Sequence, residues 1–305
     1  MNKKYRINSG VLFVFILALG FLTACKGGKK APEEEIPVTL PQDNAAILKE
    51  IKQAERIFNA LPSPLESAML IKSAGARFDE ALLNPVTNVN TYVTSKAMAL
   101  NLGVYTCDLS FASLYEQTQL LIDYMNAAKK MADGLGILKA IEQKDIDNLE
   151  ENINNSEVIM EIVSQTFMNS NSYLEDNGQP ATAAMVLVGG WVEGLYISTQ
   201  LVDINEFNGN KLVGRIIDQK LSIDILLNLL NSSKGNPAVD ELMLEVAKLK
   251  TVFDKITIDT TPVRPEYDAA SNTTVLRSQI KTDMTPAIFT ELSSVVAEIR
   301  NSFVK

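Results

Sequence analysis

The chain has 305 residues, of which 46% are hydrophobic and 21% are charged, and its formal net charge is −9 at pH 7. This composition is typical of a globular protein long enough for one large domain or two small ones. The acidic balance argues against nucleic acid as a partner. The sequence contains no histidine, which excludes Ser-His-Asp and Cys-His catalysis and His-ligated metal sites. No phosphate-binding, calcium-binding or zinc-cysteine motif is present, so the sequence indicates no cofactor and no metal.

The first 24 residues have the parts of an export signal. A basic start precedes an apolar run over residues 11–22, which is too short to span a bilayer and has the length of a signal-peptide core. The run leads into Leu22-Thr23-Ala24-Cys25, which resembles the lipobox of bacterial lipoproteins. The resemblance implies that residues 1–24 are removed and that Cys25 is lipidated and becomes the first residue.

Residues 25–43 are rich in Lys, Gly, Glu and Pro, and prolines at three positions oppose helix and sheet. We expect a flexible tether that holds a globular domain, residues 44–305, away from a membrane. Several acyl chains such as palmitate on one cysteine give stable anchoring. The expected location is the cell envelope, at the outer membrane or a periplasmic face, with the membrane as a partner through the N-terminal lipid.

Apolar residues at spacings of three and four predict helices through most of the domain. Ser63-Pro64-Leu65-Glu66 predicts an N-cap, a proline at the first helical position and an acidic first turn. The helix that it opens is expected to reach Leu83. The other predicted helices cover residues 44–61, 90–131, 145–173, 181–202, 211–230, 238–256 and 273–303, with a short piece at 137–141 and a break in the last helix at Thr285-Pro286.

The only strand candidate is residues 251–261, and it could equally be the end of a helix. The predicted fold class is therefore all-α, with about eight or nine antiparallel helices in one or two stacked helical bundles. Residues 114–120 and 195–201 share the pattern L-Y-x-x-T-Q-L, which agrees with chance or with the duplication of a helical hairpin. A duplication predicts that the two segments occupy equivalent places.

Residues 189–201, GGWVEGLYISTQL, contain the only tryptophan, Trp191, and three glycines within an apolar helical stretch. Gly190 and Gly194 lie on one helix face and would let a neighbouring backbone approach closely. Glycine inside a helix costs about 1 kcal/mol relative to alanine, so these glycines require a compensating contact. We favour close helix packing. The alternative is that the glycines open room for a ligand, with Trp191 and Tyr196 as its walls.

Glu193 and Asp108 lie among apolar residues. A buried carboxylate either pairs with a cation or has a raised pKa. We expect a buried ion pair with Arg77, Lys96 or Arg215. The alternative is an acidic cleft in which the two carboxylates face each other, where they could perform general acid/base catalysis or bind a hard cation.

The candidate ligand cleft of that alternative lies between the two helices that carry the L-Y-x-x-T-Q-L pattern. It is formed by Asp108, Tyr115, Trp191, Glu193 and Tyr196. After lipidation of Cys25 the chain keeps a single thiol, Cys107, so no disulfide is available within the chain. We interpret Cys107 as a small buried hydrophobic residue.

The lipobox, the composition rich in Lys, Asn and Ile, and the helical pattern resemble exported lipoproteins of the Bacteroidota, and the stretch GGWVEGLY is similar to helical lipoproteins of that group. The resemblance implies export, lipid anchoring and an all-helical body, and it implies no activity. The first hypothesis is a tethered helical module that binds an envelope protein or a small ligand, or has a structural role. The second is a carboxylate-based hydrolase, or a receptor for a small ligand or glycan, that uses the acidic cleft.

Overall fold

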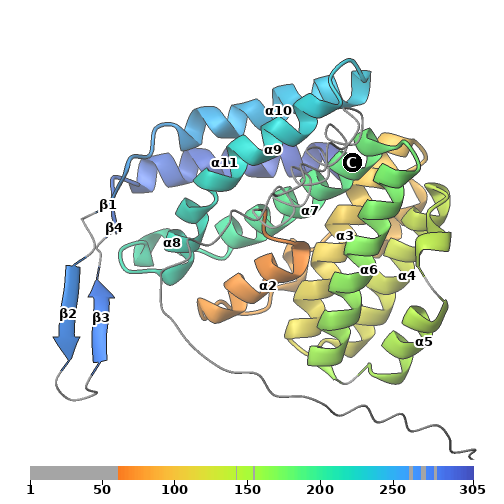
Figure 1. Cartoon of the computed structure of the whole chain (residues 1–305), viewed down its shortest axis with the longest axis horizontal. Helices are drawn as coiled ribbons and strands as arrows, with labels where there is room; N and C mark the ends of the chain where they lie inside the picture. Colours follow the sequence, from red (N-terminus) through yellow and green to blue (C-terminus); the bar gives the residue numbers. More distant parts are fainter. Residues whose placement is uncertain (1–60, 142, 154, 261–263, 269–272, 278–279) are drawn as a thin grey trace, which may run out of the picture. The chain divides into compact units, whose positions relative to one another are not determined.

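The computed structural model describes residues 61–141, 143–153, 155–260, 264–268, 273–277 and 280–305 (Figure 1). The predicted signal peptide, Cys25, the tether and nearly all of the helix expected over residues 44–61 lie outside this part of the chain. The described residues form an all-α fold, which confirms the predicted fold class.

The described part of the chain contains ten α-helices, four short 3₁₀ segments and four short strands. The α-helices are α2 (Pro64–Ser73), α3 (Ser95–Leu114), α4 (Thr118–Gly134), α5 (Gln143–Glu151), α6 (Ser156–Asp176), α7 (Pro180–Gln200), α8 (Lys211–Asp218), α9 (Lys220–Ser232), α10 (Pro237–Phe253) and α11 (Pro286–Phe303). The 3₁₀ segments are Glu80–Leu82, Val86–Asn90, Leu138–Ala140 and Ile204–Glu206, and the strands are β1 (Ile258–Thr260), β2 (Arg264–Asp268), β3 (Thr273–Arg277) and β4 (Ile280–Thr282).

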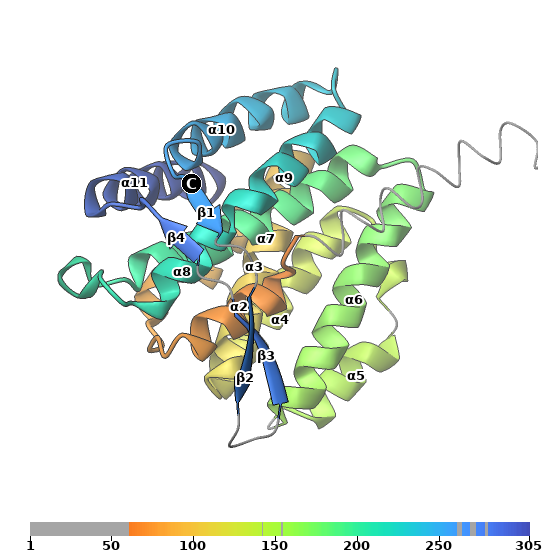
Figure 2. The same ribbon diagram turned by 60° about the vertical axis from the view of Figure 1, so that its left-hand side comes forward.

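Helices α3 and α7 form the centre of the fold. Every residue of α3 from Ala99 to Leu114 is buried, which is typical of a helix surrounded by other elements. Helices α2, α4 and α6 pack on α3, while α8, α9 and α11 pack on α7, and α10 covers α9 and α11 (Figures 1 and 2). Helix α7 is also the one described helix long and apolar enough to cross a membrane, but 83% of its most apolar stretch is buried inside the fold.

Two helices begin at the residues that the sequence predicts. The hydroxyl oxygen of Ser63 accepts a hydrogen bond from the backbone N–H of Glu66, and the Glu66 carboxylate accepts one from the backbone N–H of Ser63 at 2.7 Å, which completes a capping box for α2. The Thr285 hydroxyl oxygen accepts a hydrogen bond from the N–H of Ile288 at the start of α11. Pro64 and Pro286 occupy the first helical positions, where their missing N–H has no cost.

Several predicted helices are shorter than the sequence analysis indicates. The region 90–131 is divided by a turn at Glu116, whose φ of 59° is incompatible with a helix. The region 145–173 is divided before Asn155, which caps α6, and the region 211–230 is divided at Gln219. The prediction of continuous helices was wrong there because both halves bury a face in one core, so the apolar spacing continues across the break.

The prediction of helix over residues 273–303 was wrong at its N-terminal end. Residues before α11 form two antiparallel strand pairs, in which Ile258 faces Thr282 in β1 and β4, and Arg264 faces Arg277 in β2 and β3. The β-branched run Thr273-Thr274-Val275 favours an extended strand over a helix. The strand candidate near residue 258 is therefore correct for three of its residues.

The two L-Y-x-x-T-Q-L segments have different local structures. Residues 114–120 contain the end of α3, the turn at Glu116 and the start of α4, whereas residues 195–201 continue α7 to its C-terminus. The segments therefore do not occupy the equivalent places that a duplication requires.

Candidate functional site

The crossing of α3 and α7 brings two backbones into direct contact. A Cβ atom added to Gly189 would lie 2.0 Å from the carbonyl oxygen of Leu100, and one added to Gly103 would lie 2.1 Å from the carbonyl oxygen of Val186. Neither position can accept any side chain without moving a backbone. The glycines are thus needed for the approach of the two central helices.

Gly190 and Gly194 face neighbouring helices in the same way. A Cβ atom at Gly190 would lie 2.9 Å from Cγ of Pro64, and one at Gly194 would lie 2.7 Å from Cβ of Ser67. Both contacts are made with α2. The space beside these two glycines is therefore filled by protein, which is the close-packing arrangement, and it leaves no room there for a ligand.

Glu193 of α7 is bound by Arg300 of α11. Nε of Arg300 donates to Oε2 of Glu193 at 2.9 Å, and Nη2 donates to Oε1 at 3.0 Å. The Glu193 side chain is 0% exposed and the Arg300 side chain is 7% exposed. Nη2 of Arg300 also donates to the carbonyl oxygen of Leu82 at 3.1 Å, so the guanidinium is held by two segments of the chain.

The cation that binds Glu193 is not one of those predicted from the sequence. Arg77 is exposed, Lys96 pairs with Glu241, and Arg215 pairs with Asp218 at the surface. The spacing of residues in α11 could have indicated that Arg300 is buried. Arg300 follows Leu292 and Val296 at intervals of four, so it lies on the buried stripe of this helix. A charged residue on an apolar stripe indicates a buried partner.

Asp108 of α3 is fully buried beside this ion pair. Its Oδ2 accepts a hydrogen bond from the backbone N–H of Asn84 at 3.1 Å, and among the described residues Oδ1 meets no donor group. The charges of Glu193 and Arg300 both act on the Asp108 carboxyl. The three groups therefore form a buried cluster of two carboxyls and one guanidinium.

Burial affects the pKa values of the two carboxyls to different extents. The pKa of Asp108 is raised well above its usual value, first by desolvation and then by the negative charge of Glu193. Burial also raises the pKa of Glu193, but the bidentate contact with Arg300 opposes that change. The neutral form is therefore favoured more strongly at Asp108 than at Glu193.

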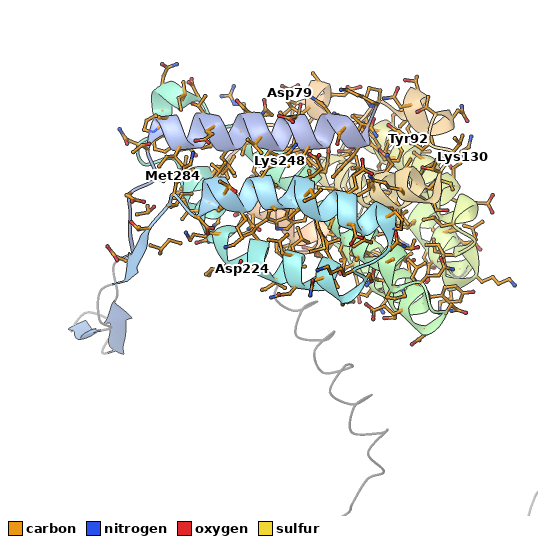
Figure 3. The ribbon with its side chains drawn as sticks, turned by 90° about the horizontal axis from the view of Figure 1, so that it is seen from above. Asp79, Tyr92, Lys130, Asp224, Lys248 and Met284 are labelled. Atoms are coloured by element: carbon orange, nitrogen blue, oxygen red, sulfur yellow. The ribbon has the colours of Figure 1, made fainter. Side chains whose placement is uncertain are left out.

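A polar network extends the cluster to the C-terminal end of α11. Nδ2 of Asn84 donates to the hydroxyl oxygen of Tyr92 at 3.1 Å and to Oδ1 of Asn101 at 3.0 Å. Nδ2 of Asn101 donates to the carbonyl oxygen of Phe303 at 2.7 Å, and the Tyr92 hydroxyl donates to the carbonyl oxygen of Val304 at 3.1 Å. Figure 3 shows Tyr92 beside the end of α11. The network supplies partners to the last carbonyl groups of the helix.

The aromatic candidates lie apart from one another. The Tyr196 ring centroid lies 4.7 Å from Cζ of Arg300, within the range of a cation–π contact. Trp191 points elsewhere, since its Nε1 donates to Oε1 of Gln219 at 3.0 Å. Tyr115 packs on Phe111 with ring centroids 4.9 Å apart.

The structure separates Trp191 from the two carboxylates of the candidate ligand cleft. Trp191 lines a cavity of about 20 Å³, which has room for about one water, and neither Glu193 nor Asp108 lines it. The physical reason is helix geometry: residues 191 and 193 are two positions apart on α7 and so point to different faces. Cys107, the thiol of α3, is fully buried as expected.

The described residues contain no cluster of three or more Asp, Glu or Cys side chains able to hold a metal ion. The place of a cation beside Glu193 is taken by the Arg300 guanidinium. The fold and this cluster define an all-α protein whose central helices are joined to the C-terminal helix by a buried ion pair. No protein family, curated protein or solved structure matches the chain.

Proposed function

We propose that the chain is a lipid-anchored helical module of the cell envelope, which acts by binding or by structural contacts rather than by catalysis. The observation that carries the proposal is the burial of Glu193, which is 0% exposed and held through both oxygens by Arg300. A general acid or base has to come within hydrogen-bond reach of its substrate. The strongest acid/base candidate of the sequence is instead occupied in joining two helices.

The same geometry argues against the alternative of an acidic hydrolase or glycan-receptor cleft. That function requires Glu193 and Asp108 to face a substrate, and both side chains are fully buried. The Arg300 contact balances the charge of Glu193 internally. A protein that uses its ionisable groups to stabilise its own core is better suited to presenting a surface or a cavity than to acid/base chemistry.

Anchoring in the envelope is supported by the sequence of the N-terminus. A basic start, a short apolar run and a cysteine that follows small residues form the pattern of a lipoprotein signal. A diacylated or triacylated Cys25 would hold the mature chain firmly on a membrane, because each buried CH₂ contributes about 0.8 kcal/mol. Partners within reach of the tether would be envelope proteins or small molecules.

Anchoring is tested by expressing the full chain in bacteria with radiolabelled palmitate and separating the lysate with a detergent that forms two phases. The expected result is a labelled protein in the detergent phase, and loss of both label and detergent partition in Cys25→Ser. Cys107→Ala is the matched control and should remain labelled, because Cys107 is buried in the fold. Absence of label from the wild-type chain, or equal label in Cys25→Ser, would contradict the proposal.

A further inference from the structure

A cavity of about 80 Å³ lies among α3, α4, α5, α6 and α7, and its lining does not include Asp108, Glu193 or Arg300. Most of its wall is apolar. Four of these helices contribute the side chains Leu109, Met125, Leu149, Val163 and Phe167. A wall of this kind suits an aliphatic group.

Asn171 of α6 lines this cavity and is only 1% exposed. Within the described part of the chain, neither its Nδ2 nor its Oδ1 meets a hydrogen-bond partner. The buried hydroxyl oxygen of Thr166, which also lines the cavity, has no partner either. A buried polar group left without a partner costs about 1–3 kcal/mol, so its presence at a cavity indicates a group that it binds.

The other fully buried asparagines of the described residues do form hydrogen bonds. Asn84 and Asn101, which are 0% exposed, each bind other groups through both the amide nitrogen and the amide oxygen. Asn171 differs from them although it occupies an equally buried place. It lies four residues after Phe167 on the stripe of α6 that faces the core, where an apolar residue would pack without any unpaired group.

We propose that this cavity binds a small apolar molecule with one neutral head group that presents a hydrogen-bond donor and an acceptor side by side, as a primary carboxamide does. The Asn171 amide offers a donor and an acceptor on one edge, so such a head group can form two parallel hydrogen bonds with it. The Thr166 hydroxyl supplies a third bond, and the aliphatic part of the molecule lies against the apolar wall.

The lining residues and the volume of the cavity limit the charge and the size of the ligand. A carboxylate has only acceptors, so it would leave Oδ1 of Asn171 unpaired and would bring a charge into an apolar space. The one charged side chain of the lining is Lys129, which is exposed and could attract a carboxylate in a different orientation. The cavity of 80 Å³ is about half the volume of a cavity of about 150 Å³ that binds benzene, so the ligand is at the small end of this class, with about two or three carbons beyond the head group.

The inference gives a ligand class to the binding role proposed above and rests on that role. Its test is a calorimetric titration of the full chain with the straight-chain carboxamides from propanamide to hexanamide. Saturable binding that peaks within this series is expected. N,N-dimethylbutanamide, which lacks the donor, and butanoate, which lacks it and is charged, should each bind at least about tenfold more weakly than butanamide.

Three variants identify the site. Asn171→Leu should reduce butanamide affinity at least about tenfold while keeping or raising the melting temperature, because it removes an unpaired amide. Asn169→Leu is the matched control on the same helix: Asn169 is exposed and is absent from the cavity lining, so affinity should not change. Thr166→Val is nearly isosteric and should reduce the affinity a few-fold, and it serves as the test if Asn171→Leu fails to fold.

The proposal is overturned if no carboxamide binds at millimolar concentration, if Asn171→Leu and Thr166→Val both bind as the wild type does, or if butanoate binds more tightly than butanamide. A crystal structure with butanamide in which Asn171 binds only water would overturn it as well. None of these results affects palmitate labelling of Cys25. Loss of that label would contradict the anchored module, whereas failure of the titration removes only the ligand site.

Discussion

Arg300 on α11 binds both carboxylate oxygens of Glu193 on α7, at 2.9 and 3.0 Å, although the two residues are 107 positions apart in the sequence. The contact joins the C-terminal helix to one of the two central helices inside a region that excludes water. A bidentate pair with a further bond from Arg300 to the Leu82 carbonyl has the geometry that can offset the loss of hydration. Removal of one partner would leave a buried charge unpaired.

Arg300→Met is therefore expected to lower the free energy of unfolding by about 3–5 kcal/mol, because Glu193 is left as an isolated buried carboxylate. Glu193→Gln should also destabilise the fold, since it leaves the guanidinium without a counter-charge. The double variant Glu193→Leu/Arg300→Met should recover much of the loss. Urea unfolding followed by the fluorescence of Trp191, which is buried and unique in the chain, measures each value.

The control for this prediction is Lys248→Met. Lys248 of α10 lies beside α11 and pairs there with Glu298, but both side chains are largely exposed (Figure 3). Its removal should leave stability nearly unchanged because exposed ion pairs contribute little. Equal stability losses in Lys248→Met and Arg300→Met would show that the buried ion pair has no special role.

The helix caps of this region could be predicted from the sequence, whereas the contacts between distant residues could not. The start of α2 and the start of α11 are determined by residues within four positions of Ser63 and Thr285, so the caps could be predicted. The pairing of Glu193 with Arg300 depends on how α7 and α11 pack, which no local spacing specifies. Burial of Glu193 and Asp108 could be predicted, whereas the pairing of Glu193 with Arg300 could not.

The breaks between helices were hidden for a related reason. Glu116 adopts a φ of 59°, which favours glycine or asparagine, so its residue type gave no indication of a turn. The cavity beside Asn171 was also hidden, because it results from side chains of five helices and from the missing partner of one amide. Such features depend on tertiary packing.

The raised pKa of Asp108 predicts a specific pH dependence of stability. Its pKa is higher in the folded than in the unfolded chain, so protonation of Asp108 favours the folded chain. This contribution to the free energy of unfolding is complete below the unfolded pKa of about 3.9 and is lost as the pH rises through the folded pKa. The contribution to the slope is about −1.4 kcal/mol per pH unit within that window. The free energy of unfolding measured across this range in urea should show it.

Asp108→Asn should remove this slope and should cost little stability near neutral pH. Asparagine resembles a protonated aspartic acid, since its amide can donate to Glu193 and its oxygen can accept from the N–H of Asn84. Asp108→Ala is the comparison variant and should be destabilised at every pH, because it leaves that N–H buried and unpaired. A slope that persists unchanged in Asp108→Asn would assign the dependence to other groups.

Two glycine substitutions, one at the contact between α3 and α7 and one in α8, should have opposite effects on stability. Gly189→Ala should destabilise the fold by at least about 3 kcal/mol, because the added Cβ would lie 2.0 Å from the carbonyl oxygen of Leu100. Gly214→Ala in α8 should instead stabilise it by about 0.5–1 kcal/mol, since no atom lies within 4 Å of the added Cβ and alanine favours the helix. Thermal unfolding of the two variants in parallel tests the prediction, and a tolerated Gly189→Ala would contradict the close approach.

Cys107 provides a direct measure of how tightly the centre of the fold is closed. In a Cys25→Ser chain it is the only thiol, it is fully buried, and burial together with the neighbouring acidic groups Asp108 and Glu193 raises its pKa. The folded protein should therefore resist thiol reagents, which react with the thiolate, and should be labelled only when it opens. Arg300→Met should accelerate labelling by about the same factor as it raises the unfolding equilibrium constant, provided that closing is faster than labelling. The contradicting result is rapid labelling of the Cys25→Ser chain without denaturant, at a rate that Arg300→Met does not change. It would mean that α3 opens locally while α7 and α11 stay together.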